Sequence, residues 1–249
     1  MRSVETGALT DRRGVSETMG FVLVFGIVVS TVAVVYVGGF DALTGARDAQ
    51  QFANTERAFD VMDSNVEDLA VRGAPSRTTE ILLSNGAIYF GESVTFNVSA
   101  GGNDYYATTI RPVVYRNDEG DELVYVDGAI FRQYGDRAVM FDEPRLASGN
   151  RTLVPYVIAR AESTNVSTDN TRRLLVRTTV AERDVRRFPD TAANLTITSP
   201  RAAAWERYLE AELAVDCDGP ADGRTGEVEC PLPGDDVYVQ AIVVNVELD

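Results

Sequence analysis

Hydrophobic residues are concentrated near the amino terminus of the chain. Met19–Phe40 is a run of twenty-two residues without a charge, MGFVLVFGIVVSTVAVVYVGGF. As a helix it would be about 33 Å long, which matches the roughly 30 Å hydrocarbon core of a bilayer. Arg12 and Arg13 precede the run and Asp41 follows it. Because basic residues favour the cytoplasmic side, the pattern predicts a single-pass helix in the cell membrane, with a cytoplasmic amino terminus and an extracellular carboxy-terminal domain.

A buried core helix and a cleaved secretory signal are the alternatives for this segment. Core helices rarely need so long an uncharged run. Secretory signals have a shorter apolar region, about 7–15 residues, that ends at a small-x-small cleavage site. Gly39-Phe40-Asp41-Ala42 matches that site poorly. Arg12-Arg13 also fits a twin-arginine signal, but Glu17 interrupts the uncharged region that should follow. Membrane anchoring is therefore the preferred interpretation.

An amphipathic pattern follows the apolar run. Apolar and small residues recur at alternating intervals of three and four, which places them on one face of a helix. These positions are Phe52, Thr55, Phe59, Met62, Val66 and Leu69. Gly73 and Pro75 then interrupt the helical pattern. The spacing predicts one long helix to about Val71, apolar first and amphipathic later.

From Thr78 onward the chain contains short segments of β-branched and aromatic residues, typical of strands. We expect strands at 80–84, 88–90, 93–98, 108–115, 123–126, 129–132, 138–141, 154–159, 174–180 and 237–246. Asn85-Gly86, Gly101-Gly102 and Asp127-Gly128 are typical of tight turns. A late helix is expected over residues 201–213. The predicted fold class is α+β, with a long N-terminal membrane-spanning helix and a mainly antiparallel, β-rich head.

The charge of the chain is strongly negative. Thirty-eight acidic residues oppose 23 basic ones, all of them Arg, and the net charge is -15. In concentrated salt the Debye length falls to roughly 3 Å or less, so repulsion between carboxylates is screened. The composition is typical of a protein from an extreme halophile. No basic stripe emerges, so we expect no nucleic-acid partner.

Two further features suit an exported domain. Asn-x-Ser/Thr sequons make Asn97, Asn150, Asn165 and Asn194 candidate N-glycosylation sites. Cys217 and Cys230 are the only cysteines, and we expect both to lie within one Gly/Asp-rich loop. In an oxidising compartment they are expected to form a disulfide, and two buried free thiols are the alternative. A zinc site does not fit, because the spacing is wrong and the chain has no His.

The composition also limits catalysis. Without His, Ser-His and Cys-His pairs are excluded, and without Lys a Ser-Lys pair is excluded. Neither a phosphate-binding GxxxxGK[ST] loop nor a strand-linked GxGxxG is present. Acidic segments at 118–122 and 216–223 depart from the calcium-binding EF-hand spacing. We therefore expect no catalytic residue, no metal and no cofactor. A secreted carbohydrate- or peptide-active enzyme is the third-ranked alternative.

The leader resembles a known processing signal. Arg12-Arg13-Gly14-Val15, followed by the apolar run, resembles the class III signal of archaeal type IV pilins, in which a prepilin peptidase cuts after the small residue. The resemblance implies cleavage between Gly14 and Val15, leaving the apolar segment on the mature protein. Glu17 would then be the third mature residue, whereas bacterial pilins carry a glutamate at the fifth. A plain topology signal beside a membrane anchor is the alternative.

Three later segments, Gly128-Ala-Ile-Phe-Arg, Arg151-Thr-Leu-Val-Pro-Tyr-Val and Trp205-Glu-Arg-Tyr-Leu, are similar to an uncharacterised family of halophilic archaeal pilin-like membrane proteins. This resemblance implies a cytoplasmic leader at 1–14, a transmembrane helix and amphipathic stalk at 15–72, and an extracellular β-rich head at 73–249. It implies three partners: membrane lipid, a prepilin-type peptidase and other pilin-like subunits in a homo- or hetero-oligomer. An uncleaved, single-pass surface protein that binds an unknown ligand is the competing interpretation.

Overall fold

The computed structural model describes residues 13–84, 86–101, 103–161, 166–168, 171–189, 192–220 and 226–249. The chain forms two compact units, of which one ends at Gln51 and the other begins at Phe52. The final part of the long helix, from Phe52, belongs to the same compact unit as the β-rich domain.

The long helix α1 extends from Arg13 to Ala70. Within the second unit, the predicted seam is confirmed from Thr55 onward: Thr55, Phe59, Met62, Val66 and Leu69 are each at most 3% exposed. Phe52, the first predicted position, is partly buried against the same cluster. The helix ends where the sequence predicts, and Gly73 adopts a φ of +75°, a conformation that favours glycine. The apolar side chains of the seam stabilise the head by roughly 1.5–3 kcal/mol each.

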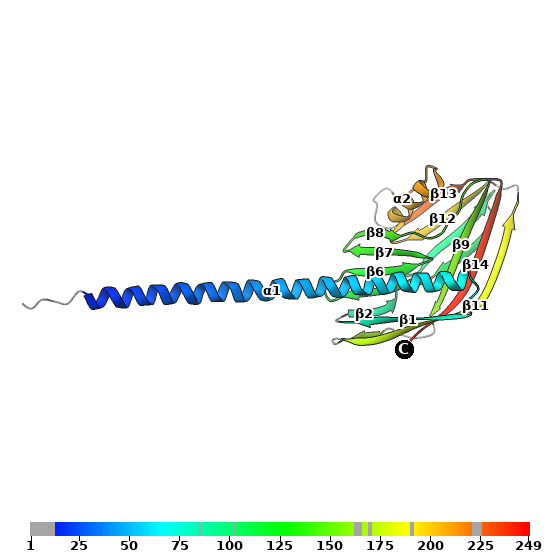
Figure 1. Ribbon diagram of the computed structural model, residues 1–249. Coiled ribbons are helices and arrows are strands. Elements are labelled where there is room, and N and C mark those ends of the chain that lie inside the picture. Colours follow the sequence, from blue (N-terminus) through cyan, green and yellow to red (C-terminus); the bar gives the residue numbers. More distant parts are fainter. Residues whose placement is uncertain are drawn as a thin grey trace, which may run out of the picture. The chain divides into compact units, whose positions relative to one another are not determined.

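Three sheets make up the head (Figure 1). The first has the order β1 (Ser76–Leu83), β11 (Arg172–Phe188), β14 (Asp236–Leu248) and β9 (Arg151–Ala161). Its pairs are antiparallel except that of β14 with β9, which is parallel. The second has the order β10 (Val166–Thr168), β2 (Gly86–Phe90), β5 (Val113–Asn117), β6 (Glu122–Val126), β7 (Ala129–Tyr134) and β8 (Arg137–Asp142). The third has the order β13 (Gly226–Leu232), β12 (Ala193–Ser199), β3 (Val94–Ala100) and β4 (Asn103–Ile110).

Two hydrophobic clusters lie inside the head. In one, the seam of α1 packs with residues of the first two sheets, including Ile81, Leu123 and Val244. The other surrounds Trp205 of α2 (Ala202–Leu213) and includes residues of all three sheets. The Trp205 ring meets Phe96 edge to face, with ring centroids 5.5 Å apart. Such pairs contribute about 0.5–1.5 kcal/mol beyond the area they bury.

The predicted fold class is confirmed, but several elements differ from the expectation. The prediction of a single strand at 108–115 is wrong. Strand β4 ends at Ile110, β5 begins at Val113, and the two belong to different sheets. Pro112 lies between them, and proline cannot donate a hydrogen bond to a strand ladder. Strands β10, β12 and β13 were not expected at all. The Asp127-Gly128 turn is confirmed, since both residues have positive φ between β6 and β7.

Candidate functional site

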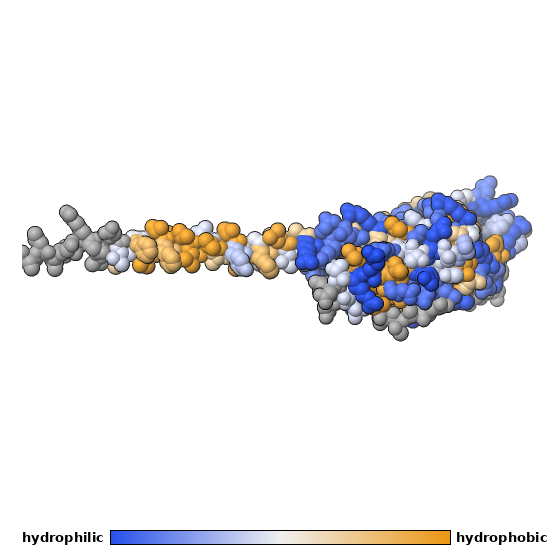
Figure 2. All heavy atoms as spheres, turned by 60° about the horizontal axis from the view of Figure 1, so that its bottom comes forward, coloured by the Kyte–Doolittle hydropathy of each residue, from blue (hydrophilic) through white to orange (hydrophobic). Residues whose placement is uncertain are grey.

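The first part of α1 presents apolar side chains outward. Fifteen large apolar residues between Met19 and Phe40 are exposed, each with at least 49% of its surface accessible. In the space-filling view this segment is mostly orange (Figure 2). Among the described residues, α1 is the one helix long and apolar enough to cross a membrane. Water is a poor solvent for such a surface, so lipid or another apolar surface is required to cover it.

Two threonine hydroxyls of α1 are satisfied inside the helix. Thr31, within the apolar segment, donates a hydrogen bond to the carbonyl oxygen of Ile27 at 2.7 Å, and Thr44, just beyond it, bonds Phe40 in the same way at 3.0 Å. A hydroxyl bonded to the preceding turn is not left as an unpaired donor in a hydrocarbon environment. Thr31 is therefore compatible with lipid.

The expected cleavage position lies at the beginning of the helix. Gly14 and Val15 are within α1, which begins at Arg13, while Arg12 lies outside the described residues. Met19 is five positions after Gly14, about 7.5 Å along a helix. The Gly14–Val15 bond thus lies close to the apolar segment along the helix.

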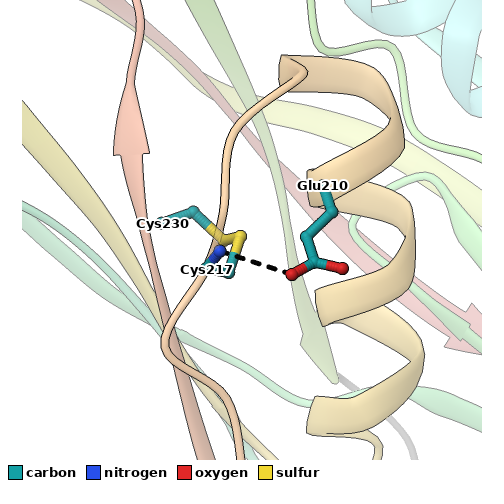
Figure 3. Close-up of a disulfide and its surroundings, with 3 residues drawn as sticks. All are labelled: Glu210, Cys217 and Cys230. Atoms are coloured by element: carbon teal, nitrogen blue, oxygen red, sulfur yellow. Dashed lines mark hydrogen bonds between the residues drawn. A yellow bond between two sulfur atoms is a disulfide. The ribbon is translucent and has the colours of Figure 1, made fainter.

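Cys217 and Cys230 form a disulfide with an S–S distance of 1.97 Å. Cys217 follows α2, and its backbone N–H donates a hydrogen bond to a Glu210 carboxylate oxygen of that helix at 3.4 Å (Figure 3). Cys230 is fully buried in β13, so the expectation that both cysteines lie in one loop is wrong. Asp218 and Glu229 exchange backbone hydrogen bonds beside the bridge. The disulfide therefore fixes the exit of α2 to a strand of the third sheet.

The four candidate glycosylation asparagines differ in accessibility. Asn97 lies in β3 and Asn194 in β12, and both are partly buried. The Asn194 amide also donates a hydrogen bond to Glu229. Asn150 is exposed just before β9, and Asn165 lies outside the described residues. Of the three described asparagines, Asn150 offers a glycan the most space.

Two carboxyl groups of the head are unusually placed. Asp127 is 6% exposed, and its Oδ1 accepts a hydrogen bond from the Val157 backbone N–H at 2.7 Å. Burial raises the pKa of Asp127 well above its usual range. Burial, with help from the nearby charges of Asp142 and Glu67, raises the pKa of Asp63 on α1 to about 7. A carboxyl of this kind is a candidate acid or base, so its surroundings decide what it can do.

The space beside Asp63 is small. The cavity lined by Asp63, Tyr125 and Val157 has a volume of about 70 Å³. Pockets that hold organic ligands usually measure about 300–1,000 Å³. Among the described residues, no group of three or more His, Cys, Asp or Glu side chains could hold a metal ion. The geometry therefore gives Asp63 room for water rather than for a substrate.

The model of a family described as "Family of unknown function (DUF7289)" matches residues 13–249. No curated protein and no solved structure matches the chain.

Proposed function

The chain belongs to the family of unknown function DUF7289, and we propose from its architecture that it is a type IV pilin-like cell-surface subunit, processed after Gly14 and assembled through its N-terminal apolar helix. The mature chain would begin at Val15 with the apolar segment. The β-rich head would lie outside the cell. The proposed partners are membrane lipid, a prepilin-type peptidase and other subunits of the same kind.

One observation carries this proposal: a single helix whose first part is apolar and exposed and whose second part is built into the β-rich unit. Fifteen large side chains between Met19 and Phe40 require cover. Each would gain roughly 1.5–3 kcal/mol on transfer out of water. Lipid supplies this cover before assembly, and the equivalent helices of neighbouring subunits supply it afterwards.

The composition of the apolar segment supports helix packing. At 100° per residue, Gly26, Ser30 and Ala33 fall within a 60° sector of the helix. An added Cβ at Gly26 would meet nothing within 4 Å, so the structure leaves that backbone open. Small residues at shared positions let helices approach closely in a membrane. This surface is the proposed contact between subunits.

Amino-terminal mapping by mass spectrometry tests the processing step. The native protein is recovered from membrane and supernatant fractions of cells that express wild type or Gly14→Trp, with Gly7→Trp as a control elsewhere in the leader. We expect wild type and the control to begin at Val15, and Gly14→Trp to keep its full leader. An intact wild-type amino terminus would overturn the pilin-like assignment. A terminus near Leu43 would indicate a cleaved secretory signal and a released head.

An uncleaved, single-pass surface protein is the second candidate function. Arg12 and Arg13 favour it, because two basic residues before an apolar helix suffice to orient it without processing. In that case the head would bind its ligand at the cell surface while the helix serves only as an anchor. The same mapping experiment separates the two candidates.

A further inference from the structure

A groove of about 830 Å³ lies on the head between the β7–β8 hairpin and the beginning of α2. Its lining includes Tyr134, Asp136, Arg137, Val139, Arg201 and Arg207. The volume is within the range of pockets that hold small organic molecules. Three positively charged residues and one negatively charged residue line it, although the whole chain carries a net charge of -15. The groove is therefore cationic on an acidic protein.

Two of the three arginines are available for a ligand. Arg137 and Arg207 are exposed, and neither is within ion-pairing distance of a carboxylate in the part of the chain that the structure describes. Arg207 donates one hydrogen bond, from Nη2 to the Ala138 carbonyl oxygen at 3.2 Å. This contact holds the guanidinium beside β8 and leaves its other donors open.

Arg201 supplies a third, buried charge. Only 8% of its side chain is exposed, and its Nε has no hydrogen-bond partner among the described residues. Its Nη2 lies 3.5 Å from Glu122 Oε2, but Glu122 also pairs with Arg116. Two guanidinium groups therefore share the Glu122 carboxylate, and Glu92 is a second carboxylate whose charge acts on Arg201. Burial makes the charge of the Arg201 guanidinium less screened than one on the open surface.

The first turn of α2 adds to the positive field. Arg201 immediately precedes the helix, its side chain makes no capping hydrogen bond, and no acidic residue lies in the first turn. Ala203 and Ala204 of that turn line the groove. A helix amino terminus carries about half a positive charge and exposes N–H donors to anions. The helix end and the arginines thus act on the same space.

We propose that this groove binds a small organic oxyanion, a carboxylate or a sulfate ester. Guanidinium groups bind both oxyanions through paired N–H donors. Tyr134 and Val139 are 50% and 57% exposed and border the same space, where they can contact the carbon skeleton of a ligand. The inference goes beyond the pilin-like function and does not depend on whether the leader is cleaved.

Isothermal titration calorimetry of the full-length protein in detergent micelles tests the proposal. The probes are glucuronate, glucose 6-sulfate and uncharged glucose, at fixed pH and ionic strength. The test variant is Arg137→Gln with Arg207→Gln. Its matched control, Arg160→Gln with Arg172→Gln, removes two exposed arginines of β9 and β11 that also lack an ion pair with a described carboxylate. Thermal unfolding of each variant checks that the head remains folded.

We expect saturable binding of at least one charged probe and much weaker binding of glucose. The groove variant should lose about tenfold or more in affinity, because it loses charge-assisted hydrogen bonds, and the control should lose less than about twofold. Preference for glucuronate or for glucose 6-sulfate identifies the oxyanion. Absence of saturable binding by both charged probes would overturn the proposal, and so would an equal loss in both double variants or equal binding of glucose.

Discussion

Asp127 shows how one residue can serve a turn and a core contact together. Its φ of +55° suits the tight turn with Gly128, and Asp and Asn adopt this conformation more readily than other non-glycine residues. Its carboxyl reaches the backbone N–H of Val157 in β9. The residue therefore connects the β6–β7 hairpin of the second sheet to the first sheet.

Replacing Asp127 tests this connection. Asp127→Ala leaves the buried Val157 N–H without its acceptor and places alanine at positive φ, so the free energy of unfolding should fall by about 1–3 kcal/mol. Asp127→Asn keeps an acceptor oxygen and tolerates the turn, so it should cost less. Denaturant unfolding of the two variants measures the difference. Equal stability of Asp127→Ala and wild type would contradict this role.

Asp63 should make the stability of the head depend on pH. Its pKa is raised from 3.8 to about 7, first by burial and then by Asp142 and Glu67, while Tyr125 and Arg145 partly oppose the increase. Between about pH 4 and pH 7 the folded chain holds a proton that the unfolded chain has lost. The free energy of unfolding should therefore fall as pH rises through this window, by up to about 1.4 kcal/mol per pH unit.

Asp63→Asn removes the titrating group and imitates its neutral form. Urea unfolding at about pH 5 and about pH 8 should show a smaller difference for this variant than for wild type. Asp118→Asn, in the exposed turn between β5 and β6, removes the same charge and should keep the wild-type difference. Burial also raises the pKa of Asp127, so this residue too lowers the free energy of unfolding as pH rises. It accounts for pH dependence that remains in Asp63→Asn. If wild type and Asp63→Asn respond to pH equally, Asp63 is not the group responsible.

Among the elements, those with a strong periodic pattern could be predicted from sequence. The seam of α1 follows from the alternating intervals of three and four, because helical geometry puts those residues on one face. Strand β12 alternates buried and more exposed residues over Ala193–Ser199. The same alternation of apolar and polar residues is present in the sequence there, so this strand was predictable although it was not predicted. The exchange of sheets at Pro112 does have a local signal, because proline donates no hydrogen bond to a strand ladder. Strand β4 pairs with its hairpin neighbour β3, whereas β5 pairs with β2 and β6.

The disulfide and the groove also differ in how far the sequence predicts them. Cys217 and Cys230 could be paired because they are the only cysteines and are thirteen residues apart. The groove could not be predicted, because Arg137 and Arg207 come from a hairpin and a helix that meet only through the fold. In a chain with 23 arginines, no local pattern marks these two.

The disulfide should stabilise the connection between α2 and β13. It closes a short loop, and in the chain-entropy model such a cross-link contributes about 3 kcal/mol. The double variant Cys217→Ser with Cys230→Ser should therefore have a free energy of unfolding that is lower by about 3 kcal/mol. Hydrogen exchange should increase first in β13 and the end of α2, where the bridge is attached. Unchanged exchange there, with unchanged stability, would show that packing alone holds the two elements.

On the scale of the whole molecule, the two compact units satisfy hydrophobic burial differently. The unit from Phe52 to Asp249 buries its apolar residues in two internal clusters. The apolar residues from Met19 to Phe40 are exposed within the chain itself. The fold of the chain therefore leaves the apolar residues from Met19 to Phe40 unburied, and lipid or another apolar surface has to cover them.

Charges placed in the middle of the apolar segment should release the protein from the membrane. Val28→Arg with Val29→Arg costs about 2.5–3.5 kcal/mol per arginine at the centre of a spanning helix, enough to disfavour insertion. Leu82→Arg with Val185→Arg is the matched control, because both residues are exposed on the head, at 54% and 65%. After alkaline carbonate extraction, wild type and the control should sediment with membranes, and the helix variant should remain in the supernatant or be degraded. Sedimentation of the helix variant with membranes would mean that another part of the chain, or a partner, holds the protein there.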